Sequence, residues 1–335
     1  MPHRTAALRL FQTGTFLTRD QLETRQTPLY FATVLAAIAF GLVADAGAAP
    51  DLEALITPAI AVLMYAMFLQ IPFLHLRASL ANRRFMTALL LANFVLVPVL
   101  AWALTRGLTG HPALLIGALL VLLAPCIDYV VVFTHMGKGD ARLMLAATPV
   151  LLLLQLVLLP LYLALMLEDG DHISLALGPF VQAFVLMIVA PLALAVLTSA
   201  HVAKSERVSR WNDAWAWMPV PAMALVLFVV IASQIGIVLQ ALDQLLPVVP
   251  VYLGFALLAP VIGWATARLT GLAVQQTRAV MFSASTRNSL VVLPLALALP
   301  EQIRTLAAAA VITQTVVELI CELVYVRAFP VVART

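Results

Sequence analysis

Four ionisable side chains stand inside long apolar stretches of the chain, where polar residues are otherwise scarce, and a cysteine stands where one of these stretches is interrupted. They are Cys126, Asp128, Arg287, Glu318 and Glu322. A charged group near the centre of a lipid bilayer costs about 2.5–3.5 kcal/mol on insertion scales, so each one needs a partner or access to water. Such groups commonly mark the path of a substrate or an ion through a membrane protein.

Two of the apolar stretches are interrupted, and the interruptions contain three of these residues. The first reads Ala-Pro-Cys-Ile-Asp over residues 124–128, and the second reads Ser-Ala-Ser-Thr-Arg-Asn-Ser over residues 283–289. Non-helical backbone at membrane depth is tolerated only where it lines a cavity or is buried in protein. A matched pair of breaks therefore indicates a substrate site. The predicted substrate-binding residues are Cys126, Asp128, Ser285, Arg287, Asn288 and Ser289.

The charged residues near the breaks admit two interpretations. In the first, Asp128 and Arg287 form an ion pair whose only role is to neutralise the two charges where the breaks cross. In the second, a substrate or a proton competes with this pairing. Asp128 and Glu318 are the candidate proton-coupling residues. Glu322, one helical turn after Glu318, is expected to reach interfacial water.

The two cysteines suggest different roles. Cys126 follows a proline in a segment expected to line a cavity, and a thiol is a soft ligand suited to thiophilic species. Cys321 is expected to be a small buried hydrophobe. Two cysteines cannot build a three-thiolate metal site. The sequence also has no phosphate-binding loop, so it encodes no ATP-driven pump and concentrative transport needs an ion gradient or a separate ATPase partner. We expect the ion gradient, and no cofactor.

The composition indicates a polytopic membrane protein. Of the 335 residues, 63% are hydrophobic and 10% are charged, whereas soluble domains contain about 45–50% apolar and about 25% charged residues. The net charge of +3 argues against a nucleic-acid partner. These values exclude a soluble enzyme, and we expect the lipid bilayer to surround the chain.

Hydrophobic runs of about 20 residues predict ten transmembrane helices. Their predicted ranges are 28–44, 53–76, 85–105, 112–133, 141–167, 173–198, 214–239, 244–269, 278–299 and 303–328. Nearly all Lys and Arg residues then fall on the side of both termini, which predicts cytoplasmic N- and C-termini in the inner (plasma) membrane of the cell.

Ten spans divide into two sets of five, which insert with opposite orientation. The predicted fold is therefore all-α, with two inverted five-helix repeats whose interrupted fourth and ninth helices meet. The predicted segments are an N-terminal cytoplasmic tail at 1–27, repeats at 28–167 and 168–328, and a C-terminal cytoplasmic tail at 329–335.

The stretch from Cys126 to Asp140 resembles the arsenical-resistance (arsenite efflux permease) family of the bile acid/sodium symporter superfamily. In that family a fourth-helix cysteine precedes a Lys-Gly-Asp motif at the spacing found here, and residues 284–290 are similar to its ninth-helix segment. The resemblance implies fourth and ninth helices that cross near the midplane, and efflux of arsenite or antimonite driven by the proton gradient. It makes Cys126 the essential cysteine. Ser289 stands where the family has an essential glutamate, and Asp128 is the nearest substitute.

The sodium-coupled organic-anion branch of the same superfamily gives an alternative. Its ninth helix has a glutamate before an Asn-Ser pair, and here Asn288 and Ser289 remain without a preceding acid. In this interpretation the chain is a sodium- or proton-coupled symporter of a small organic anion, Arg287 clamps the anion, and Cys126 is incidental. A membrane sensor is disfavoured, because the sequence shows no soluble signalling domain.

Overall fold

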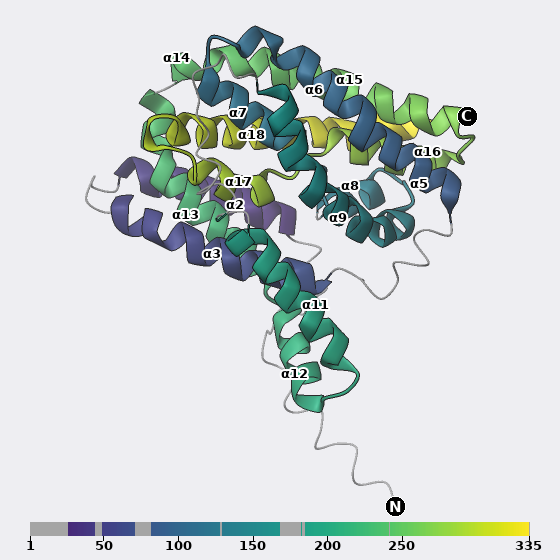
Figure 1. Cartoon of the computed structure of the whole chain (residues 1–335), viewed down its shortest axis with the longest axis horizontal. Helices are drawn as coiled ribbons and strands as arrows, with labels where there is room; N and C mark the ends of the chain where they lie inside the picture. The colour runs from purple at the N-terminus through teal and green to yellow at the C-terminus, as the bar shows by residue number, and fades with distance from the viewer. Residues whose placement is uncertain are drawn as a thin grey trace, which may run out of the picture.

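The computed structural model describes residues 26–43, 49–70, 82–127, 129–167, 182, 185–240 and 242–334. All regular elements in these ranges are helices, and they pack into two bundles (Figure 1). The first bundle, in the lower part of Figure 1, contains α2 (Gln26–Val43), α3 (Ala49–Gln70), α11 (Ala190–Val202), α12 (Glu206–Trp215) and α13 (Pro219–Gln240).

The second bundle is larger and contains both predicted breaks. Its helices are α5 (Arg83–Leu91), η2 (Ala92–Leu96), α6 (Val97–Thr105), α7 (Pro112–Leu122), α8 (Tyr129–Met136), α9 (Ala141–Met166), α15 (Val249–Leu269), α16 (Val274–Ser285), α17 (Ser289–Leu297) and α18 (Glu301–Val332). Short elements η3 (Arg106–Leu108), η4 (Val185–Val189), α14 (Leu242–Leu245) and η5 (Leu246–Val248) connect or extend these helices.

Several of the described helices are long and apolar enough to cross a bilayer. Four continuous stretches meet this requirement, namely Arg83–Leu108, Ala141–Met166, Leu242–Leu269 and Glu301–Val332. The bent pair Glu206–Trp215 and Pro219–Ser233 adds a fifth if it is one span. The chain is therefore an all-helical, multi-pass membrane protein in its described part, whereas the count of ten spans stays a prediction.

Some helix ends differ from the predicted spans for local reasons. The span predicted over 214–239 begins only at Pro219, after a bend of 47° from α12, because Pro219 and Pro221 disfavour a helical path through the preceding residues. At the other end of the chain α18 continues to Val332, beyond the predicted end at residue 328.

A proline also shapes the helix that faces the second break. Pro98 has no N–H, and its ring would clash with the carbonyl of residue 94 in a regular α-helix. The chain forms the π-helical turn η2 just before it. The carbonyl of Phe94 accepts a hydrogen bond from the Tyr162 hydroxyl instead. The same turn holds the buried side chain of Asn93, which enters the site described below.

Two glycines let helices of the second bundle approach closely. A Cβ on Gly117 of α7 would lie 2.6 Å from the carbonyl oxygen of Ala307 on α18. A Cβ on Gly263 of α15 would lie 2.7 Å from Cα of Met281 on α16. In lipid the hydrophobic effect does not drive helices together, and small residues allow the close van der Waals packing that does. The second bundle is thus packed backbone against backbone around the two breaks.

Candidate functional site at the helix crossing

The two interrupted segments meet and pair through their main chains. Pro125 and Arg287 form an isolated antiparallel bridge. The N–H of Cys126 donates to the carbonyl of Thr286 at 3.1 Å, and the N–H of Asn288 donates to the carbonyl of Ala124 at 2.8 Å. These bonds satisfy backbone groups that the ends of α7, α16 and α17 leave open. The sequence-predicted meeting of the breaks is therefore present, as a crossing of residues 123–127 with residues 286–288.

The Arg287 side chain lies wholly inside the second bundle, with 0% of its surface exposed. Its Nη2 donates to Oδ1 of Asn93 at 2.7 Å, to the carbonyl of Ala284 at 2.8 Å and to the carbonyl of Ser283. Its Nη1 donates to the carbonyl of Leu122 at 3.4 Å. Four neutral oxygens thus surround the guanidinium. Its predicted partner Asp128 lies outside the described residues.

Asn93 fixes the far side of this guanidinium site. Its amide nitrogen donates to the carbonyl of Leu89 and to the hydroxyl of Ser283, each at 3.0 Å, which leaves Oδ1 for Arg287. The sequence interpretation did not include Asn93. The signal was an amide side chain in an otherwise apolar stretch, shortly before a proline.

Glu318 lies at the crossing, where three polar groups contact its carboxyl group. Its Oε2 accepts from the main-chain N–H of Arg287 at 2.7 Å and from the side-chain amide of Gln314 at 2.6 Å. Its Oε1 lies 2.8 Å from the hydroxyl of Tyr129, which lies 2.8 Å from the carbonyl oxygen of Arg287 as well. Tyr129, adjacent to the first break, was not predicted to belong to the site.

Glu322 was predicted to reach interfacial water, and this prediction is wrong. Its side chain is 0% exposed, and Oε1 accepts a hydrogen bond of 2.6 Å from the Thr286 hydroxyl. The second break lies against this face of α18 and brings the Thr286 hydroxyl to the Glu322 carboxyl group. Hydropathy alone does not show this contact and places Glu322 near the membrane surface. The same hydroxyl lies 2.6 Å from the carbonyl of Phe282.

The other predicted site residues occupy different positions around the crossing. The buried Ser285 hydroxyl donates to the carbonyls of Met281 at 2.9 Å and Phe282 at 3.2 Å. Asn288 caps α17, with Oδ1 accepting from the N–H of Val291 at 3.2 Å. Cys126 is buried in the crossing.

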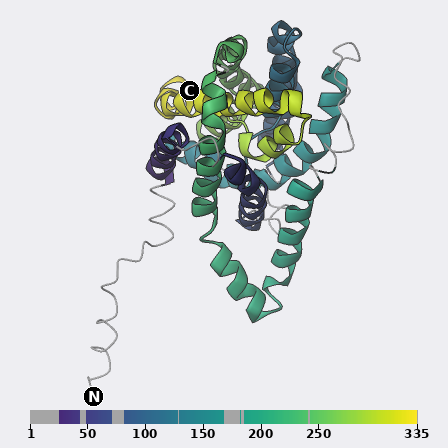
Figure 2. The same ribbon diagram turned by 90° about the vertical axis from the view of Figure 1, so that its left-hand side faces the viewer.

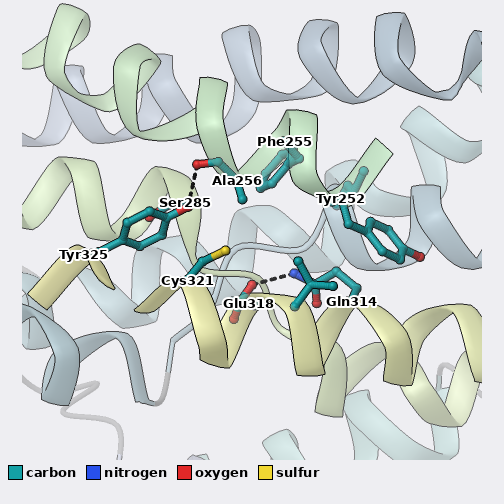
Figure 3. Close-up of a pocket in the computed structure, with 10 residues that line it drawn as sticks. Tyr252, Phe255, Ala256, Ser285, Gln314, Glu318, Cys321 and Tyr325 are labelled. Atoms are coloured by element: carbon teal, nitrogen blue, oxygen red, sulfur yellow. Dashed lines mark hydrogen bonds between the residues drawn. The ribbon is translucent and has the colours of Figure 1, made fainter. Parts of the chain in front are cut away.

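A small cavity adjoins the crossing on the side of α15. It has a volume of about 10 Å³, room for about one water molecule. Figure 3 shows Gln314, Glu318, Cys321 and Tyr325 of α18 facing Tyr252, Phe255 and Ala256 of α15 across this space, with Ser285 beside them. The cavity places water or a small ligand in reach of the Glu318 carboxyl group.

A larger cavity of about 240 Å³ lies between the two bundles. Apolar side chains make almost all of its lining, and Tyr129 and Ser289 mark its boundary with the crossing. The lining residues are Tyr30, Val34, Tyr129, Val132, Phe133, Met223, Val226, Leu227, Val230, Ile231, Ser289, Leu293, Val311, Ile312, Thr315, Val316, Leu319 and Ile320. Within the described chain, Arg287 and Cys126 belong to the lining of neither cavity.

The Lys-Gly-Asp motif forms a tight turn between α8 and α9. Lys138 has a φ of 56° and Asp140 caps α9 by accepting from the N–H of Leu143 at 3.0 Å. A Cβ on Gly139 would lie 2.7 Å from the Thr134 side chain and 3.2 Å from the main-chain nitrogen of Ala279. The motif therefore has a structural role: it lets the turn between α8 and α9 pack closely against α16. It is not part of the crossing.

Arg278 joins this turn to the end of α18, and its removal gives a testable change in stability. Its guanidinium donates to the carbonyls of Lys138 at 3.1 Å, Pro330 at 3.2 Å and Ala333 at 2.9 Å. We expect Arg278→Ala to lower the free energy of unfolding by about 2 kcal/mol, the contribution of about one hydrogen bond from a charged donor, because the bond to Lys138 is exposed and the other two are only partly buried. The thermal unfolding midpoint should fall clearly below that of Arg327→Ala, which loses an exposed arginine. Equal midpoints would contradict this role.

Comparison with known proteins agrees with this architecture. A family model described as the Sodium Bile acid symporter family matches residues 57–241, more than half of the chain. No curated protein gives a significant match. The matched range contains the first break and ends before the second. The chain belongs to the sodium bile acid symporter family, and it is a membrane transporter.

Proposed function

We propose that this chain is a secondary transporter that moves an organic solute, apolar over most of its surface, in exchange for or together with protons. The observation that carries the proposal is the 240 Å³ cavity between the bundles, whose lining is almost entirely apolar and which reaches the crossing at Tyr129 and Ser289. Substrate sites of secondary transporters lie near the membrane midplane beside interrupted helices. The ten spans, the inverted repeats and the cytoplasmic termini belong to the same proposal.

Alternating access follows from the two-bundle arrangement. The second bundle is held together by glycine contacts at Gly117 and Gly263 and by the paired breaks. The cavity lies at its boundary with the first bundle. Rocking of one bundle against the other would therefore open the cavity to either side while the crossing stays intact.

Protons are the proposed coupling ion because the Tyr129 hydroxyl has fewer hydrogens than nearby acceptor oxygens. The hydroxyl has a single hydrogen, and two oxygens lie 2.8 Å from it, the Glu318 Oε1 and the Arg287 carbonyl. If Glu318 is protonated and donates to the tyrosine oxygen, the hydroxyl gives its hydrogen to the carbonyl alone and each contact is a full hydrogen bond. Loss of the proton turns Tyr129 toward Glu318 and leaves the carbonyl unpaired. Tyr129 also lines the large cavity, so protonation of Glu318 and the shape of the substrate site are linked.

Sodium is disfavoured as the coupling ion by the position of Arg287. Hard cations require several oxygen ligands. At the crossing the oxygens of Asn93, Leu122, Ser283 and Ala284 already accept hydrogen bonds from the guanidinium. We infer that the Arg287 guanidinium stabilises the crossing by donating to these oxygens, in the place of a bound metal ion.

Arsenite efflux through Cys126 is the competing assignment. Cys126 is buried in the crossing, outside the lining of both cavities, and the cysteine that does line a cavity is Cys321. A large cavity with an almost entirely apolar lining matches a small inorganic hydroxide neither in size nor in polarity. These placements favour the organic solute over arsenite.

The proposal is tested by filling the cavity from the first bundle. Val230 of α13 lines it and is buried, whereas Leu225 on the same helix is 51% exposed. We expect Val230→Trp to reduce proton-driven uptake of an amphipathic anion such as deoxycholate or indoleacetate into proteoliposomes at least tenfold. Leu225→Trp, which introduces the same side chain at an exposed position outside the cavity, should retain uptake.

The same proteoliposomes separate the competing assignment. If the protein transports only arsenite, and Cys126→Ser abolishes that transport while Val230→Trp does not, the cavity is not the substrate site and the proposal is wrong. If a sodium gradient drives uptake and a pH gradient does not, the proton assignment is wrong but the cavity assignment stands.

A further inference from the structure

An open cleft lies in the turn between α11 and α12, away from the crossing. It has a volume of about 360 Å³. The lining residues are Leu197, Thr198 and His201 from α11, and Arg207, Val208 and Trp211 from α12. Figure 2 shows this part of the chain, in teal and green, as a V that projects from the body of the molecule.

The helix α12 has the properties of a helix that lies in a membrane surface. None of its described residues is buried, and Trp211 is 52% exposed. The Trp211 ring lies 5.6 Å from that of Trp215, and its indole N–H donates to the Tyr65 hydroxyl at 3.0 Å. Exposed tryptophans and arginines on one short amphipathic helix are typical of the layer between lipid head groups and acyl chains.

The residues that line the cleft include one cationic side chain, Arg207, and three apolar ones. Arg207 lines the cleft together with Thr198 and His201, and Nδ1 of the His201 ring donates to the carbonyl of Leu197 at 2.8 Å. Leu197, Val208 and Trp211 supply the apolar part. Arg210, on the same helix, lies 3.9 Å from the carboxylate of Glu206 instead. The cleft therefore suits a phosphate that carries an apolar chain.

We propose that this cleft binds the head group of an anionic phospholipid. Arg207 contacts the phosphate, and Trp211 and Val208 contact the glycerol and the first carbons of the acyl chains. A phospholipid fits better than a free phosphate ion, because half of the lining is apolar and α12 carries the exposed Trp211. The bound lipid would fasten the V-shaped extension of the first bundle to the membrane surface.

The proposal is tested with the full-length protein in detergent, titrated with phosphatidylglycerol or phosphatidylcholine. Bound lipid is counted by native mass spectrometry. We expect tighter binding of phosphatidylglycerol, and a loss of about fivefold in its affinity in Arg207→Gln, the effect of one basic residue near an anionic surface. Arg210→Gln is the matched control, with the same charge change outside the cleft, and should change the affinity less than twofold. The thermal midpoint of both variants without added lipid shows that they remain folded.

Three results would overturn the proposal. Equal affinity for the two lipids would remove the role of charge. An equal loss in Arg207→Gln and Arg210→Gln would indicate a diffuse electrostatic attraction instead of a site. Displacement of the lipid by millimolar inorganic phosphate or glycerol phosphate would identify a soluble phosphate as the ligand.

Discussion

Glu318→Gln is expected to abolish proton-driven accumulation of substrate, by at least 100-fold, while substrate exchange across the membrane continues. The glutamine oxygen can replace Oε2 and accept from Gln314 and the Arg287 N–H. Its amide nitrogen then donates to Tyr129, as a protonated carboxyl group would. The variant is thus fixed in the geometry of the protonated transporter and cannot release a proton.

The measurement compares two assays in proteoliposomes. Uptake driven by a pH gradient reports coupling, and counterflow of labelled against unlabelled substrate reports the movement of the loaded transporter. Glu322→Gln tests the second carboxyl group of the same helix, because the Thr286 hydroxyl also lies 2.6 Å both from Glu322 Oε1 and from the carbonyl of Phe282; we expect it to retain pH-driven uptake, since Glu322 does not contact Tyr129. Retention of pH-driven uptake in Glu318→Gln would place the proton elsewhere, and Asp128 would be the next residue to examine.

Removal of the Arg287 side chain is expected to convert a sodium-insensitive protein into a sodium-sensitive one. Arg287→Ala leaves the oxygens of Asn93, Leu122, Ser283 and Ala284 buried without a donor. Each buried neutral acceptor that loses its donor costs about 1–3 kcal/mol. A sodium ion can occupy the vacated oxygens, and at 100 times its Kd it would return about 2.7 kcal/mol.

The thermal unfolding midpoint in sodium chloride and in choline chloride at equal ionic strength measures this effect. The wild type should show equal midpoints in the two salts, and Arg287→Ala should show a lower midpoint that sodium raises. Arg327→Ala, which removes an exposed arginine of α18, should resemble the wild type. A sodium-dependent midpoint in the wild type, or an Arg287→Ala variant as stable as the wild type, would contradict the proposed role of the guanidinium.

The sequence predicted where the helices break but not what surrounds the breaks. Pro125 and the polar run at 283–289 indicate non-helical backbone, because proline and hydroxyl side chains act on the adjacent main chain. The crossing and its main-chain bonds follow from these local effects. The arsenite assignment came from the same region, and neither the cavities nor the comparison supports it beyond the level of the family.

The remaining contacts depend on residues far apart in the chain. Tyr129 and Glu318 are separated by 189 positions, and Asn93 and Arg287 by 194. Hydropathy gives the depth of a residue in the membrane but not the neighbour it faces. For this reason Glu322 was placed near water, and Arg287 was paired with Asp128 or, in the alternative, with an anion. The large cavity was not predicted, since its apolar lining resembles any lipid-facing surface in sequence.

The antiparallel pairing of the two breaks uses main-chain atoms of Cys126, Thr286, Ala124 and Asn288. Any amino acid other than proline can make such bonds at the two donor positions. The main-chain pairing itself therefore sets few requirements on the side chains at these four positions, although the crossing also depends on the Arg287 side chain. A transporter of this design can change its coupling ion or its cargo through a few substitutions at the breaks, which makes residues 283–289 the place to begin if its specificity is to be re-engineered.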